Sequence, residues 1–115
     1  MAWQGIDRRT RARANYPCTI VVLRTDLRQS FSTHTENISG GGTCVILPKE
    51  LPKNCPVEVL LYLKDGGGAL SCNGRAVWVA QKQDIFSTGI QFLDISEVDA
   101  LRIEKVVQEC LGKKT

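Results

Sequence analysis

Two short polar motifs carry most of the chemistry that this sequence offers. The first is a cluster of arginines that runs from Arg8 to Arg13 and contains Arg9 and Arg13 with three residues between them. The second spans residues 37–42, has the pattern N-x-S-x-x-G, and follows a β-like run. A guanidinium group is planar and permanently charged, so it pairs with phosphate and donates two parallel hydrogen bonds to guanine O6 and N7. The two motifs together therefore predict a site for a small ligand that carries phosphate and guanine.

The second motif contributes short polar side chains and glycine. Asn37 and Ser39 are two positions apart, so on an extended chain they face the same side, where they can reach a base edge. Gly42 lets the backbone approach a ligand closely or adopt a positive φ. Farther along the chain, Trp78 offers an aromatic surface beside a base. Partial burial in the core is an equally good interpretation of this tryptophan.

Composition and charge narrow the possible functions. The 115 residues fit one domain, with the 43% hydrophobic and 23% charged content of an ordinary globular protein. The net charge is only +3, and the basic residues gather in one cluster instead of forming the broad basic surface that suits long nucleic acid. The N-terminus lacks the apolar stretch of a signal peptide, and the apolar runs are too short to cross a bilayer. We therefore expect a soluble, cytoplasmic protein that does not insert into membranes.

The remaining reactive residues form no catalytic or metal-binding pattern. The five cysteines include no C-x-x-C pair, so we expect core thiols in place of a zinc site or a disulfide framework. His34 lies in a polar segment that has no Cys or carboxylate cluster beside it. Asp65 and Asp84 are interpreted as turn residues. We predict that the protein is not an enzyme and holds no metal or cofactor.

A small β-rich domain must position these motifs. Short apolar runs rich in β-branched residues predict about six strands, and the turn over residues 65–68 predicts a hairpin. In the fifth strand, Ala76, Trp78 and Ala80 are expected on one face. Antiparallel strands of this number close most easily into a barrel. The predicted strands cover residues 18–23, 31–37, 43–47, 57–63, 70–79 and 89–93.

The apolar period becomes helical near the C-terminus. Ser96 is predicted to cap a helix that ends at Gly112. The expected division is an N-terminal arm over residues 1–14, a β-barrel over 15–95 and a helix over 96–112. The apolar face of this helix either covers one end of the barrel or forms a dimer or partner surface, and the sequence leaves both alternatives open.

With these features the chain resembles the PilZ domain, the bacterial receptor for cyclic di-GMP. The resemblance rests on Arg9-x-x-x-Arg13 and on Asn37-x-Ser39-x-x-Gly42, whose first position accepts Asp or Asn in the family. Residues 75–78 and 89–94 strengthen it. The resemblance implies an all-β fold with a C-terminal helix, namely a six-stranded antiparallel β-barrel preceded by a flexible N-terminal arm.

The resemblance also implies the ligand and its contacts. Arginine directly before the first motif accompanies a stacked pair of ligand molecules in this family, so Arg8 predicts two cyclic di-GMP molecules per protomer. The ligand is expected to change the shape of the protein, which then regulates an unidentified protein partner in trans, in motility, exopolysaccharide or adhesion output. The expected ligand-binding residues are Arg8, Arg9, Arg13, Asn37, Ser39, Gly42 and Trp78.

Two other functions remain open at this stage. One is a ligand-independent PilZ adaptor between proteins, although members of that kind usually lack the arginines that this chain has. The other is a barrel that binds single-stranded nucleic acid, which requires a basic groove and several exposed aromatic side chains. The aromatic content of 6% and the balanced charge outside the arm disfavour it. Either a monomer or a ligand-modulated dimer fits the sequence.

Overall fold

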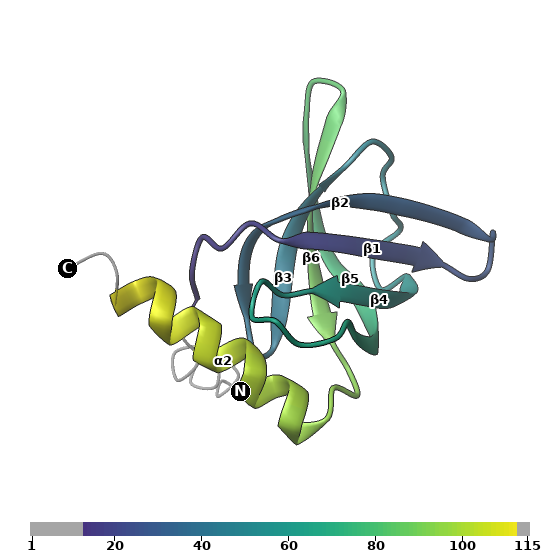
Figure 1. The fold of residues 1–115 in the computed structure, drawn as a ribbon. Helices are drawn as coiled ribbons and strands as arrows, with labels where there is room; N and C mark the ends of the chain where they lie inside the picture. The colour runs from purple at the N-terminus through teal and green to yellow at the C-terminus, as the bar shows by residue number, and fades with distance from the viewer. Residues whose placement is uncertain (1–12, 113–115) are drawn as a thin grey trace, which may run out of the picture.

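The computed structural model describes residues 13–112, which form a closed antiparallel β-barrel followed by one helix (Figure 1). Around the barrel the strands are ordered β1-β2-β3-β6-β5-β4. The predicted six-stranded barrel with a C-terminal helix is therefore confirmed, whereas the predicted flexible arm falls largely on residues 1–12, outside the described residues. The elements are β1 (Thr19–Arg24), β2 (Gln29–Ser39), β3 (Gly42–Leu47), β4 (Pro56–Tyr62), β5 (Leu70–Lys82), β6 (Ile85–Phe92) and α2 (Glu97–Gly112).

Alternating residues of the strands fill the interior of the barrel. In β4, Val57, Val59 and Leu61 are buried while the residues between them are more exposed, which is the period of two that a pleated strand requires. Ile20 and Val22 of β1 are buried in the barrel interior in the same alternating way. Because the sheet closes on itself, the central parts of these strands present no free edge.

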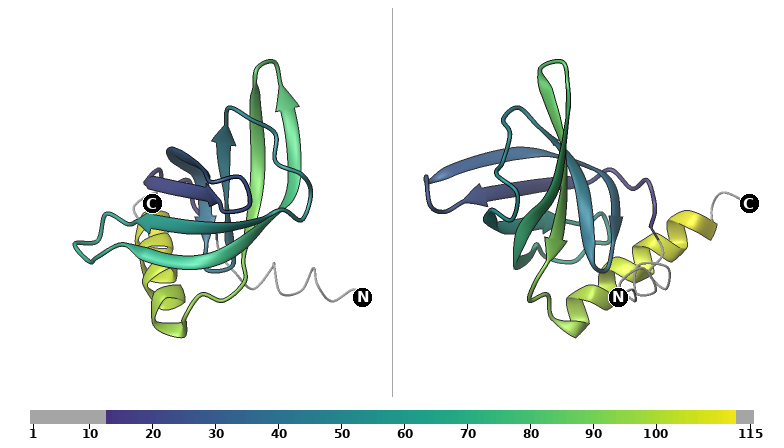
Figure 2. Two further views of the ribbon diagram at one scale, coloured as in Figure 1. Left: turned by 90° about the vertical axis from the view of Figure 1, so that its right-hand side faces the viewer. Right: turned by 180° about the vertical axis from the view of Figure 1, so that it is seen from behind.

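Turns that contain residues in the left-handed backbone conformation connect the strands. Gly66 has φ of 83°, and the backbone N–H of Gly67 donates to the Asp65 carboxylate at 2.9 Å, so the predicted turn between β4 and β5 is confirmed. Gln83 (φ 56°) and Asp84 form the turn between β5 and β6. These two strands continue beyond the closed part of the barrel as a projecting hairpin (Figure 2).

Helix α2 packs against the barrel at the end of β2. Its start is capped as predicted, because Ser96 Oγ accepts the backbone N–H of Asp99 at 3.1 Å. Ile103, Val106 and Val107 are buried and join the barrel core. These three residues therefore cover the barrel, as in the first of the two alternatives, whereas Val98 and Leu101 of the same helix are exposed.

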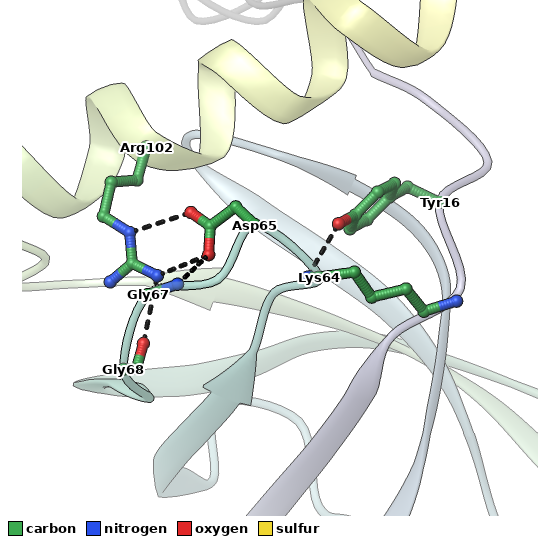
Figure 3. A network of polar contacts seen from close by, with 6 residues as sticks. All are labelled: Tyr16, Lys64, Asp65, Gly67, Gly68 and Arg102. Atoms are coloured by element: carbon green, nitrogen blue, oxygen red, sulfur yellow. Dashed lines mark hydrogen bonds and ion pairs between the residues drawn. The ribbon is translucent and has the colours of Figure 1, made fainter.

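A polar network ties α2 to the turn between β4 and β5 (Figure 3). The Arg102 guanidinium donates to both carboxylate oxygens of Asp65, at 3.1 and 2.9 Å, and to the Gly68 carbonyl at 3.0 Å. One residue before Asp65, the backbone N–H of Lys64 donates to the Tyr16 hydroxyl at 2.8 Å. The turn is therefore held from the helix on one side and from the segment before β1 on the other.

Two β-bulges shift the strand register. The extra residue is Glu36 in the β2–β3 pair and Val77 in the β5–β6 pair. A bulge moves every later side chain of its strand to the opposite face. The expectation that Ala76, Trp78 and Ala80 share one face is therefore wrong: Ala76 is fully buried, whereas the Trp78 side chain is 45% exposed.

Candidate ligand-binding face

The two polar motifs meet beside the end of β2. Nη1 of Arg13 donates a hydrogen bond of 2.9 Å to Oδ1 of Asn37. Arg13 is exposed and Asn37 is partly exposed, so both side chains face solvent. Arg8 and Arg9, the other arginines predicted to bind ligand, lie outside the described residues.

The segment before β1 holds Arg13 in this place. Ala14 and Ile38 exchange two backbone hydrogen bonds, of 3.1 and 3.0 Å, in an antiparallel bridge, and Ala14 is only 4% exposed. Farther along, the Thr35 hydroxyl donates to the Tyr16 carbonyl at 2.6 Å. The bulge in β2 lies between these two attachment points. The backbone that carries Arg13 is therefore fixed to β2 while its guanidinium remains accessible.

Ser39 and Gly42 shape the turn between β2 and β3. The Ser39 hydroxyl is buried, accepts the Gly41 N–H at 3.2 Å and lies 3.4 Å from the Gly42 carbonyl, to which it donates. Gly42 does not have a positive φ, in contrast to Gly66. Its lack of a side chain has a different cause, because a Cβ at this position would collide with the carbonyl oxygen of Ile90 on β6. The motif thus allows β3 to approach β6 closely.

The pairing of the strands links Asn37 to Trp78 through a row of opposite residues. Asn37 is opposite Cys44, Cys44 is opposite Gly89, and Gly89 is opposite Trp78. Residues directly opposite in an antiparallel pair point to the same side, so these four side-chain positions form one row on the outward side of the sheet, in which Cys44 is itself only 6% exposed. Strands lie about 4.8 Å apart, which puts Trp78 about 14 Å from Asn37 along the sheet.

Gly89 has a specific role under Trp78. A Cβ at position 89 would collide with the indole ring, so the ring lies against the β6 backbone at this glycine. Trp78 is thereby pinned to the outer face with 45% of its surface exposed. Of the two interpretations of this tryptophan, the aromatic surface fits its position better than a place in the core. No sequence pattern reveals the pairing of Gly89 with Trp78, because it depends on the bulge at Val77.

Sequence reasoning missed the part that Gln91 and Arg75 take in this face. Gln91 is opposite Gly42 on one side and Arg75 on the other, and Nε of Arg75 donates to its amide oxygen at 3.1 Å. The partner of Arg75 in this bond is therefore a neutral amide and not a carboxylate. Gln91 follows Gly89 by two positions, so the sequence alone predicts that both residues face the same side of β6. The residues opposite Gln91 on β3 and β5 could not be predicted in this way.

Other chemistry is sparse in the described part of the chain. Among residues 13–112, no group of three or more His, Cys, Asp and Glu side chains is placed to hold a metal ion. No helix within that range is long and apolar enough to cross a membrane. The described cysteines are free, and burial raises the pKa of the Cys18, Cys55 and Cys72 thiols. These thiols are therefore protonated near neutral pH, as suits core residues.

Comparison with known proteins supports a single family. The sequence profile described as PilZ domain matches residues 7–110. A search of curated protein sequences finds no match to this chain.

Solved structures show the same fold at low sequence identity. The chain is similar to the inhibitor of motility MotI/DgrA of Bacillus subtilis, with a TM-score of 0.77, 14% identity, and coverage of 93% of this chain and 51% of that one. It is similar to Escherichia coli YcgR in complex with c-di-GMP, with a TM-score of 0.74, 14% identity, and coverage of 93% and 47%. The isolated PilZ domain of YcgR with c-di-GMP gives a TM-score of 0.69 at 13% identity and covers 93% and 94%. The chain thus spans about half the length of MotI and YcgR, and nearly all of the isolated domain.

Proposed function

The chain belongs to the PilZ domain family, and on this premise we propose that it is a cyclic di-GMP receptor that regulates a protein partner in trans. The observation that carries the proposal is the hydrogen bond between Arg13 and Asn37, which joins the two motifs on one exposed face. The asparagine amide orients the guanidinium without neutralising its charge, so the group remains able to pair with a phosphate or a guanine edge.

The remaining predicted contacts complete this site. Arg9 and Arg13 bind phosphate and guanine from the arm, Asn37 contacts a base edge, and Trp78 supplies a surface for stacking. Ser39 acts through the turn that it shapes, and Gly42 acts by admitting β3 close to β6. Both of the latter residues therefore hold the face in shape more than they touch the ligand.

Binding acts as a switch in this proposal. The ligand closes the part of the arm before Arg13 over the face, and the new surface engages or releases the partner in the bacterial cytoplasm, where this second messenger acts. The similarity to an inhibitor of motility supports a motility output, with exopolysaccharide and adhesion machinery as the other candidates. Hydrogen exchange of the arm amides tests the switch: protection that is already complete without ligand contradicts it.

The stoichiometry follows from Arg8. An arginine before the motif stacks on, or pairs with, a second ligand molecule, so we propose two cyclic di-GMP molecules per protomer. Arg8→Leu should lower the saturation ratio from two to one. Saturation of the wild-type protein at one equivalent contradicts this part of the proposal alone.

Calorimetric titration with cyclic di-GMP tests the receptor function. GTP and linear pGpG serve as competitors, Arg9→Ala and Arg13→Ala as site variants, and Arg28→Gln, on the turn between β1 and β2, as a control that also removes one charge. Binding that both site variants lose and the control keeps supports the proposal. A ligand at 100 times its Kd adds about 2.7 kcal/mol of stability, so the absence of both heat and a thermal shift identifies a ligand-independent adaptor instead.

A further inference from the structure

Arg75 lies in the same row of outward-facing positions as Arg13, across β2, β3 and β6. Ser39 is opposite Gly42, Gly42 is opposite Gln91, and Gln91 is opposite Arg75. The antiparallel bridge between Ala14 and Ile38 continues this row to Arg13. In the register of that bridge, Arg13 is opposite Ser39. The row therefore runs from Arg13 to Arg75, and on the other side of Arg75 lies Pro56 of β4. At about 4.8 Å per strand, the two arginine positions are about 19 Å apart along the sheet.

Both arginines are held in the same way. Nη1 of Arg13 donates to the amide oxygen of Asn37 at 2.9 Å, and Nε of Arg75 donates to the amide oxygen of Gln91 at 3.1 Å. A neutral amide fixes the orientation of a guanidinium and leaves its full charge in place. Carboxylates pair with two other arginines of the described chain, in Arg24–Asp26 and Arg102–Asp65.

Acidic residues near Arg75 do not neutralise it. Glu58 is opposite Asn73 in the β4–β5 pair, two positions from Arg75. The Asp94 carboxylate accepts the backbone and side-chain N–H groups of Asn73, at 2.7 and 2.8 Å. Within residues 13–112 no ion pair of Arg75 with a carboxylate is formed. A cation that is oriented but not neutralised, on a face that already carries a second one, fits an acceptor supplied by a ligand.

The neighbouring Trp78 indicates which group of a ligand Arg75 would bind. The bulge at Val77 brings Trp78 to the outer face three residues after Arg75 on the same strand, in the neighbouring row. The ring is pinned over Gly89 and half-exposed. An aromatic surface beside a guanidinium fork suits a guanine, whose face stacks on the ring and whose O6 and N7 accept from the fork.

We infer that Arg75 and Trp78 form a guanine subsite on β5, with Gln91 as the residue that positions Arg75. This inference rests on the proposed function and extends the ligand site from the arm and β2 to β5. In this arrangement one ligand guanine lies near Arg13 and Asn37, and another lies on Trp78.

Calorimetric titration with cyclic di-GMP tests the subsite in the Arg75→Gln and Arg75→Lys variants. Arg28→Gln is the charge-matched control, and thermal melting verifies that each variant is folded. We expect Arg75→Gln to weaken binding about tenfold or more, since a bidentate guanine contact is lost. Arg75→Lys weakens it nearly as much, because an ammonium group keeps the charge but lacks the fork. The control stays within about twofold of the wild type.

A mixed cyclic dinucleotide of guanine and adenine sharpens the test, because adenine presents an amino donor where guanine presents O6. Arg75→Gln should lose most of the wild-type preference for cyclic di-GMP over this ligand. Unchanged binding by folded Arg75→Gln, together with loss of binding by Arg13→Ala, overturns the subsite and leaves the receptor function intact. Wild-type affinity in Arg75→Lys overturns guanine recognition in favour of simple charge. A wild-type protein that does not bind cyclic di-GMP refutes the receptor function and the subsite with it.

Discussion

The Arg13 guanidinium donates a 2.9 Å hydrogen bond to the Asn37 side chain, 24 positions away in the sequence. Two residues that act together in binding give non-additive losses when both are replaced. We predict that Arg13→Ala and Asn37→Ala each weaken cyclic di-GMP binding, and that the double variant loses about 0.5–3 kcal/mol less than the sum of the single losses. Calorimetry on the four proteins measures this coupling. Strictly additive losses would show that the two motifs contact the ligand independently.

The close approach of β3 to β6 at Gly42 predicts a stability difference between two glycines. A Cβ at Gly42 collides with a backbone carbonyl that cannot move without disturbing the β3–β6 ladder, so Gly42→Ala should cost about 1–3 kcal/mol. Gly68→Ala is the matched control, because a Cβ there meets nothing within 4 Å. Its effect should stay within about 0.5 kcal/mol. Urea denaturation compares the two, and equal unfolding midpoints would rule out the close approach.

The pair of Asp65 with Arg102 predicts a pH-dependent part of the stability. The hydrogen bond from Arg102 holds the pKa of the Asp65 carboxyl below its usual value. A depressed carboxyl pKa stabilises the folded state above the unfolded pKa of about 3.9, and this contribution disappears as the pH falls through the lower folded pKa. The pair lies near the surface, so Asp65→Asn should cost at most about 1 kcal/mol at pH 7.

Denaturation of wild-type protein and Asp65→Asn between neutral and strongly acidic pH measures this effect. The difference in unfolding free energy should be constant at neutral pH and shrink below about pH 4. Arg102→Gln is the reciprocal variant and should show the same pH dependence. A difference that persists at low pH would mean that Asp65 acts through its hydrogen bonds to the turn and not through its charge.

Cys72 is predicted to react slowly with thiol reagents. Burial, followed by the charges of Asp94 and Asp99, raises the pKa of this thiol to about 11. Only the thiolate reacts, so at pH 8 the native protein should show the same fast-reacting thiols with or without Cys72→Ser. After denaturation the wild-type protein should titrate all five thiols and the variant one fewer. Loss of a fast-reacting native thiol in the variant would contradict the prediction.

The strands and the helix were predictable because their signals are local. The run over residues 57–63 is apolar except for Glu58, so β4 was expected almost where it lies. Ser96 predicted the start of α2, and its hydroxyl caps the helix as expected by accepting the backbone N–H of Asp99. The turn at Gly66 was visible because the sequence places several glycines where a positive φ is needed.

The faces of β2 and β5 were not predictable in the same way. A bulge such as the one at Val77 adds one residue to one strand of a pair, and nothing in the local alternation marks it. The error over Ala76 and Trp78 follows directly from this. Similarly, the motif residues Asn37 and Ser39 were identified by type and spacing, whereas the place of Arg75 beside Gln91 depends on a register between distant segments.

The position of Trp78 over Gly89 has an optical consequence. The chain contains two tryptophans, and Trp3→Phe leaves Trp78 as the only one. Its indole is half-exposed on the face that the ligand is proposed to occupy, so its fluorescence reports the polarity and the stacking partners of that face directly. The protein therefore carries its own label within the proposed site, and quenching of this emission should report the arrival of the proposed ligand in real time without any attached dye.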